Sequence, residues 1–136
     1  ALSNSFLVTK QLTEIRALGV SIAIDDFGKG YSNLAYMRDV AIDTIKIDKT
    51  FVMELEQSPV NKAIIEATQL IAKSVGCQVV AEGIETMQQL HELRDMGITE
   101  GQGYLFSKAI SLDDFVNLAQ QEILIGSSLS QKLKAV

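Results

Sequence analysis

The chain has 136 residues, enough for one domain, and its 47% hydrophobic and 21% charged residues are typical of a soluble globular protein. Its net charge of −5 argues against broad binding of DNA or other nucleic acid, which needs a basic face to neutralise phosphates. A single cysteine, Cys77, excludes an internal disulfide, and the lack of a long apolar run or signal-peptide pattern predicts a cytoplasmic protein with no direct membrane insertion.

The first predicted elements are a helix and a strand separated by a glycine. A helix is expected from about Asn4 to Leu18, because apolar residues recur there at helical spacing. Gly19 then fits the position after a helix end, where a left-handed conformation costs glycine little. The next residues, Val20 to Ile24, read as a short apolar strand that Asp25 and Asp26 close.

A second strand and a second copy of this layout follow. Asp43 to Asp48 is expected to be a strand, with Ile45 and Ile47 flanking a lysine. An amphipathic helix over residues 60–75 is followed by Gly76 and by a strand that ends at Glu82.

A third copy comes next, with a helix over residues 87–96, then Gly97, then a strand that reaches Gln102. This alternation predicts an α/β fold with a parallel sheet, either a doubly wound open sheet or a (β/α)8 barrel. Four strands are too few to close a barrel. The strands at Val20 to Ile24 and near Thr99 to Leu105 are therefore expected to have open outer edges, and the tail at 121–136 to be a helix or frayed end.

Three polar residues share one predicted face of the sheet. Side chains alternate along a strand, so Asp25, Lys46 and Glu82 should point into one cavity from neighbouring strands. Lys46 alone would suggest a sheet edge, and Asp25-Asp26 alone a helix cap. Together they suggest carboxylates that hold Mg²⁺ or Mn²⁺ beside a lysine that contacts a reacting oxygen.

Four ordered segments resemble the motifs of EAL domains, and together they make a specific match between residues 19 and 115. They are Asp25-Asp26-Phe27-Gly28-x-Gly30-Tyr31-Ser32, Ile45-Lys46-Ile47-Asp48-x-x-Phe51, Val80-Ala81-Glu82-Gly83-Ile84-Glu85-Thr86 and Gly101-Gln102-Gly103-Tyr104-Leu105-Phe106-Ser107.

The resemblance implies a partial (β/α)8 TIM-type barrel with parallel strands that lacks the first strands. It also implies hydrolysis of one phosphodiester bond of cyclic di-GMP, a bacterial signalling nucleotide, to linear pGpG with Mg²⁺ or Mn²⁺. By this resemblance Asp25 is the aspartate shared by two metal ions, Asp26 is a ligand of the second, and Glu82 is a metal-linked carboxylate of the active site.

The remaining roles are implied in the same way. Lys46 corresponds to the lysine that orients the attacking water, and Gln102 to a polar contact near that water. Glu85 corresponds to the glutamate that steadies the loop after the aspartate pair. No residue is assigned to substrate binding. Lys29 departs from the family, which usually has threonine or another small residue there, and it adds a positive charge to this loop.

The Glu-Ala-Leu motif, and the asparagine and second glutamate expected on the next strands, do not occur in the sequence. We therefore expect residues 1–136 to be the C-terminal part of a single barrel domain, inactive alone, and paired with a missing N-terminal part or with a second copy as a homodimer. One alternative is a degenerate EAL module that binds cyclic di-GMP or a protein partner without catalysis. Another, less compatible with four motifs in order, is a flavodoxin-like domain with fortuitous acids.

Overall fold

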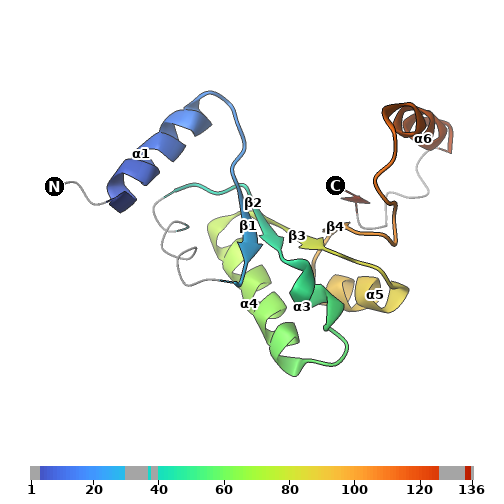
Figure 1. Cartoon of the computed structure of the whole chain (residues 1–136). Coiled ribbons are helices and arrows are strands. Elements are labelled where there is room, and N and C mark those ends of the chain that lie inside the picture. The colour runs from blue at the N-terminus through green and yellow to red at the C-terminus, as the bar shows by residue number, and fades with distance from the viewer. Residues whose placement is uncertain (1–3, 30–36, 38–39, 126–133, 136) are drawn as a thin grey trace.

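The structure is a computed structural model that describes residues 4–29, 37, 40–125 and 134–135. Helices and strands alternate along these residues, and the strands gather in one sheet (Figure 1). The elements are α1 (Asn4–Ala17), β1 (Ala23–Phe27), β2 (Thr44–Ile47), α3 (Lys49–Met53), α4 (Pro59–Val75), β3 (Gln78–Glu82), α5 (Met87–Asp95), β4 (Glu100–Gln102), α6 (Leu112–Ile125) and β5 (Lys134–Ala135).

The sheet has the order β1-β2-β3-β4-β5, and each described neighbouring pair is parallel. Consecutive strands lie side by side, and helices connect several of them, as in one arc of a TIM-type barrel. This confirms the predicted α/β class and the partial-barrel architecture. Because parallel strands end at the same edge, the residues after Ile47, Glu82 and Gln102 meet at one edge of the sheet.

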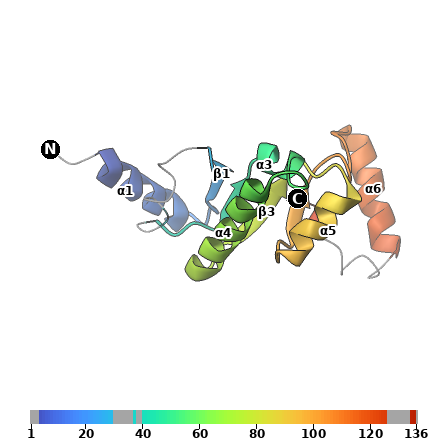
Figure 2. The same cartoon turned by 90° about the horizontal axis from the view of Figure 1, so that it is seen from below.

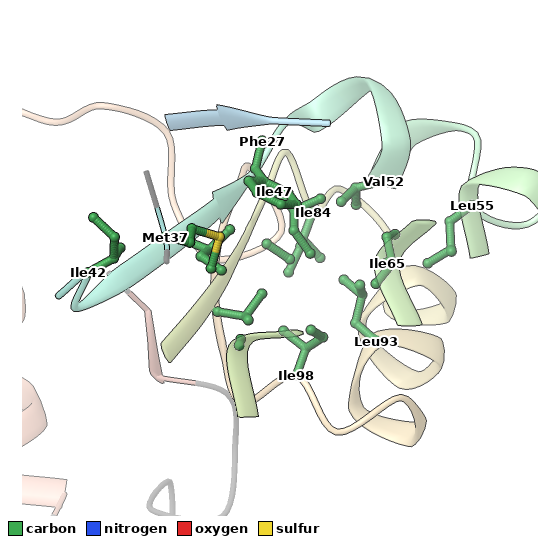
Figure 3. Packing of buried hydrophobic residues seen from close by; sticks show 14 of the residues in the cluster. Phe27, Met37, Ile42, Ile47, Val52, Leu55, Ile65, Ile84, Leu93 and Ile98 are labelled. Carbon is green, nitrogen blue, oxygen red and sulfur yellow. The ribbon is translucent and has the colours of Figure 1, made fainter. Parts of the chain in front are cut away.

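The core lies between the central strands and helices α4 and α5. Ile45 of β2, Ile65 of α4 and Leu93 of α5 have at most 1% of their surface exposed. Figure 3 shows Ile65 and Leu93 close to Ile84 and Val52 in this cluster. Burying each such side chain contributes roughly 1.5–3 kcal/mol, so this layer fixes β2 and β3 beneath the candidate site.

Helix ends in this layer follow their sequence signals. The N-cap Ser58 of α4 accepts a hydrogen bond from the amide of Asn61, and Pro59 occupies the first turn. At the other end Gly76 has a φ of +75°, and Gly19 after α1 has a φ of +86°, which is the left-handed conformation predicted for Gly19. Thr86 and Gln89 form a capping box at the start of α5.

The first strand begins three residues later than predicted. Ile22 lies outside the ladder because its amide donates to Asp43 Oδ2 at 2.7 Å, and its carbonyl accepts from the Asp43 amide. Pairing then starts with Ala23 opposite Thr44, so the strand runs on through Asp25 and Asp26 to Phe27. The two aspartates are therefore inside the strand and do not close it.

The prediction that the outer edge of β4 is open was also wrong. The tail forms α6 and then β5, whose Lys134 and Ala135 pair with Glu100 and Gly101 of β4. The expected helix in the tail is thus confirmed as far as Ile125, but the strand after it was not anticipated. β5 has only two residues, which is too short for the alternation of apolar and polar residues from which a strand is predicted.

Helices α1 and α6 project from opposite ends of the molecule in both views (Figures 1 and 2). Large apolar side chains on them are exposed, including Phe6 of α1 and Phe115 of α6. Neither these helices nor the others in the described part of the chain are long and apolar enough to cross a membrane.

Candidate active site

A β-bulge places two acidic residues opposite one lysine. Ile24 pairs with Ile45 and Phe27 pairs with Ile47, so Asp25 and Asp26 on β1 together face Lys46 on β2. The bulge also changes the backbone, since Asp26 has a φ of +52°, a left-handed conformation that aspartate tolerates better than most residues. Neighbouring carboxylates are thereby directed to different partners.

Lys46 forms the centre of the first group. Its ammonium forms an ion pair with Glu82 Oε1 of β3 and lies 3.6 Å from Asp25 Oδ2. Gln102 of β4 donates from Nε2 to the same Glu82 oxygen at 3.1 Å. The structure therefore brings together four of the predicted site residues, Asp25, Lys46, Glu82 and Gln102, from four adjacent strands.

The electrostatics of this group keep Lys46 charged. The hydrogen bond to Glu82 is the largest effect, and with the nearby charge of Asp25 it outweighs partial burial and raises the pKa of Lys46. The Lys46 side chain is 27% exposed, so a ligand can reach it. A fixed ammonium with solvent access can stabilise negative charge on a phosphoryl oxygen or orient a water molecule.

Lys29 forms the centre of a second group that the sequence did not predict. Its ammonium lies 2.7 Å from Asp48 Oδ2 and 3.5 Å from Asp26 Oδ1. Asp48 also accepts hydrogen bonds from the amide and hydroxyl of Thr50, as the N-cap of α3. The only available signals were the unusual lysine at 29 and an aspartate followed by a short helix, and neither shows that the two meet.

Asp48 is the most buried acid of the two groups, with 5% of its side chain exposed. Burial alone would raise the pKa of this carboxyl, but the hydrogen bonds from Lys29 and Thr50 outweigh it and hold the pKa well below its usual range. The same contact with Asp48 raises the pKa of Lys29. Lys29 and Asp48 therefore form a charged, directed pair at the start of α3.

The carboxylates predicted to hold metal divide between the two groups. Asp25 and Glu82 meet at Lys46, whereas Asp26 is near Lys29. The donors fit Mg²⁺ or Mn²⁺ in kind, because all are carboxylates and the side chains of Asp25 and Asp26 are 64% exposed. The described residues contain no group of three or more His, Cys, Asp or Glu side chains placed to hold a metal ion. The metal assignment therefore stays a prediction.

A cavity of about 650 Å³ opens beside Glu82 and Gln102. Tyr104 lines it, and the ammonium of Lys108 lies 5.5 Å from the centre of the Tyr104 ring. The sequence analysis did not single out these two residues as lining a cavity, because an aromatic residue and a lysine four positions apart are common. The remaining lining residues are Lys49, Met53, Gly83, Glu85, Gly103, Ser107 and Ala109.

Glu85 lines this cavity from the turn before α5, and its amide donates to Gln89 Oε1 at 2.8 Å. The loop that Glu85 is predicted to steady continues after Lys29 into residues 30–36. These lie outside the described residues and include Gly30, Tyr31 and Ser32 of the first motif. The role of Glu85 therefore also stays a prediction.

Comparison with known protein families gives one consistent match. The family model of the EAL domain matches residues 3–109 of the chain. A curated relative is the probable cyclic di-GMP phosphodiesterase PdeB of Escherichia coli (strain K12), which is 45% identical over 112 residues. The alignment covers 82% of this chain but only 21% of PdeB.

Solved structures agree with the sequence match. The EAL domain of Mycobacterium smegmatis DcpA is 37% identical, with a TM-score of 0.81, over 88% of this chain and 54% of that one. Klebsiella pneumoniae BlrP1, solved as a complex with manganese and cyclic di-GMP, is 38% identical with a TM-score of 0.68 over 73% of this chain and 25% of that one. A further BlrP1 complex contains calcium and the same nucleotide. The chain thus spans about half of the DcpA domain and smaller parts of the other relatives.

Proposed function

The chain belongs to the EAL domain family, and from this premise we propose that it supplies the lysine-containing part of a cyclic di-GMP phosphodiesterase site. The observation that supports this proposal most is the group of Asp25, Lys46, Glu82 and Gln102 at one edge of a parallel sheet. Catalytic groups of TIM-type barrels lie at the carboxyl ends of the strands, where this group is found.

In this proposal Lys46 acts directly on the reacting atoms. Its ammonium orients the attacking water or stabilises the charge that develops on a phosphoryl oxygen, and Glu82 holds it in place. Gln102 fixes Glu82 through its hydrogen bond, which leaves the lysine aimed at the solvent side of the group. The product is linear pGpG, formed when water adds to one phosphorus and one ribose oxygen leaves.

Asp25, Asp26 and Glu82 would hold Mg²⁺ or Mn²⁺, together with ligands from outside this chain. A bound divalent cation supplies Lewis-acid chemistry, which lowers the pKa of water and neutralises phosphoryl oxygens. The manganese and calcium in BlrP1 complexes support a divalent cation, and this chain's oxygen donors suit the same class of ion.

The cavity beside Glu82 is the proposed substrate pocket. Its volume of about 650 Å³ lies in the range of small-ligand sites, and it is lined by Glu82 and Gln102 of the Lys46 group as well as by Tyr104 and Lys108. An aromatic ring suits stacking with a nucleobase, and the two lysines that line the cavity, Lys49 and Lys108, suit phosphate.

We further propose that these residues act only in a complete barrel. β1 is a terminal strand of the described sheet, and no described strand pairs with its outer edge, which the N-terminal part of a barrel or a second copy would cover. Light scattering on the 136-residue chain should show self-association. A well-folded monomer at high concentration, with the β1 edge exposed in hydrogen exchange, would contradict this.

The test of function is cyclic di-GMP hydrolysis by a complete domain that contains this segment. Steady production of pGpG is expected, with a large loss of turnover in Lys46→Ala and no loss of folding. Binding of cyclic di-GMP without turnover would instead support a non-catalytic module. The 136-residue chain alone should show no useful turnover, and steady turnover by that chain, free of contaminating enzyme, would refute the proposed dependence on a complete barrel.

A further inference from the structure

Lys29 is held in place by more contacts than an ordinary surface lysine. Its ammonium lies 2.7 Å from Asp48, whose carboxylate is itself fixed by Thr50. Its backbone amide donates to the Asp26 carbonyl at 3.3 Å. The preceding residue, Gly28, has a φ of +104° and lies directly against the ring of Phe51, where a Cβ would be 2.7 Å from a ring carbon.

These contacts fix a positive charge next to one particular carboxylate. The Lys29 ammonium lies 3.5 Å from Asp26 Oδ1, an oxygen that would otherwise be open to solvent and to cations. The stronger contact is with Asp48, so Lys29 does not depend on Asp26 for its position. A cation that approaches Asp26 therefore meets a charge of the same sign that is anchored elsewhere.

We propose that Lys29 is a built-in counterion that weakens divalent-cation binding at Asp26 and so sets the cation concentration at which the site fills. This inference rests on the proposed function, because it takes Asp26 to be a metal ligand. Lys29 is a positioning residue in this scheme and does not touch the reacting atoms. A cation at Asp26 must displace the Lys29 contact with Oδ1, while the contact with Asp48 remains.

The test measures Mn²⁺ binding to a purified complete domain that contains this chain, through the electron paramagnetic resonance signal of free Mn²⁺. Lys29→Met keeps most of the side-chain length and removes the charge, so it should tighten Mn²⁺ binding about tenfold. Lys29→Arg keeps the charge and should stay within about threefold of the parent chain. Lys10→Met is the matched control, since Lys10 is an exposed lysine that pairs with Glu14 at 3.8 Å on α1, and it should leave Mn²⁺ affinity unchanged.

A double-mutant cycle assigns the effect to Asp26. Asparagine tolerates the left-handed backbone at this position, so Asp26→Asn should preserve the bulge. In the Asp26→Asn background, Lys29→Met should give no gain in Mn²⁺ affinity. The proposal is overturned if Lys29→Met binds Mn²⁺ no tighter than the parent chain, or if its gain persists without the Asp26 carboxylate.

A measurement on the unaltered chain covers the case in which a variant fails to fold. During a Mg²⁺ titration followed by NMR, the terminal methylene signal of Lys29 should move with the same midpoint as the Asp26 amide. A stationary Lys29 signal while the Asp26 amide shifts would contradict displacement. None of these readouts involves turnover, so a domain that binds Mn²⁺ as described but leaves cyclic di-GMP intact would refute the proposed function alone.

Discussion

Lys46 and Lys29 each lie between two carboxylates, one from β1 and one from farther along the chain, yet the two groups are built differently. Lys46 is 27% exposed and its main partner Glu82 is held by Gln102 on the next strand. Lys29 is 47% exposed, but its main partner Asp48 is almost fully buried. Lys46 lies among strands and is partly exposed, while Lys29 is an exposed side chain held by a buried carboxylate.

The difference shows how one local backbone feature can give adjacent identical residues different environments. Asp25 and Asp26 would normally point to opposite faces of a strand. Here the bulge and the left-handed φ of Asp26 leave Asp25 with Lys46 and bring Asp26 to Lys29. Strain of this kind at a bulge is common next to active sites.

The largest expected effect comes from removing the carboxylate that orients Lys46. In a complete domain, Glu82→Gln should lower turnover by about a hundredfold or more, because Lys46 loses its ion pair and a candidate metal ligand loses its charge. Glu66→Gln, at an exposed position on α4, is the control and should stay near the parent rate. Pre-steady-state and steady-state hydrolysis assays check this, and equal losses in both variants would count against the Lys46 group.

Replacing a glycine beside each group by alanine should lower the free energy of unfolding by different amounts. A Cβ at Gly103 would lie 2.1 Å from the Ile84 carbonyl oxygen, a backbone atom that cannot turn away, so Gly103→Ala should destabilise the chain by about 3 kcal/mol. At Gly28 the obstacle is the Phe51 ring, which can shift, and about 2 kcal/mol is expected.

Gly19 is the matched control for the glycine series. Gly19 has a φ of +86°, but no heavy atom lies within 4 Å of the position that a Cβ would take. Gly19→Ala should therefore lower the free energy of unfolding by only about 1 kcal/mol, through backbone strain. Urea denaturation of the three variants gives the comparison. A Gly103→Ala variant no less stable than Gly19→Ala would show that the backbone around Glu82 and Gln102 is looser than described.

The first group could be predicted from sequence because it depends on strand periodicity. The alternation of Ile45, Lys46 and Ile47 defines two faces, and Glu82 and Gln102 each end a strand that follows a helix-ending glycine. The register of β2 with β3, with Lys46 opposite Val80, then places the side chains as expected.

The second group could not be predicted because it depends on tertiary contacts without a periodic signal. Lys29 and Asp48 are 19 positions apart, and the backbone that leads to Lys29 contains a left-handed Asp26 and a Gly28 that packs on Phe51. The boundary of β1 was missed for a similar reason, since the side chain of Asp43 captures the Ile22 amide. Side-chain hydrogen bonds of this type change element ends without changing hydrophobic patterns.

An ion pair between a lysine and a glutamate outside the site should have the smallest effect on stability. Lys62 of α4 lies 2.8 Å from Glu92 of α5, and its hydrogen bond lowers the pKa of Glu92. A carboxyl whose pKa is lower in the folded state stabilises the fold above its unfolded pKa, about 4.3, and loses this contribution as the pH falls.

The Tm of Glu92→Gln should therefore be slightly lower than that of the parent chain at pH 7, and the two Tm values should converge as the pH falls below about 4. Melting curves between pH 7 and 3 measure this, with Glu66→Gln on the exposed side of α4 as the control. A gap in Tm that widens in acid would contradict the sign of the Glu92 shift.

Lys46 and Lys29, the two lysines beside adjacent aspartates, are expected to have different roles, and one titration separates them. Cyclic di-GMP hydrolysis by a complete domain is measured against Mn²⁺ concentration for the parent, Lys46→Ala and Lys29→Met. We predict that Lys46→Ala lowers the maximal rate at saturating Mn²⁺ by about a hundredfold or more. Its Mn²⁺ midpoint should also fall, because Lys46 pairs with Asp25 and Glu82. We predict that Lys29→Met moves the midpoint about tenfold lower and changes the maximal rate far less. If Lys29→Met lowers the maximal rate as much as Lys46→Ala does, or if Lys46→Ala leaves the maximal rate near that of the parent, the division of roles between Lys46 and Lys29 is wrong.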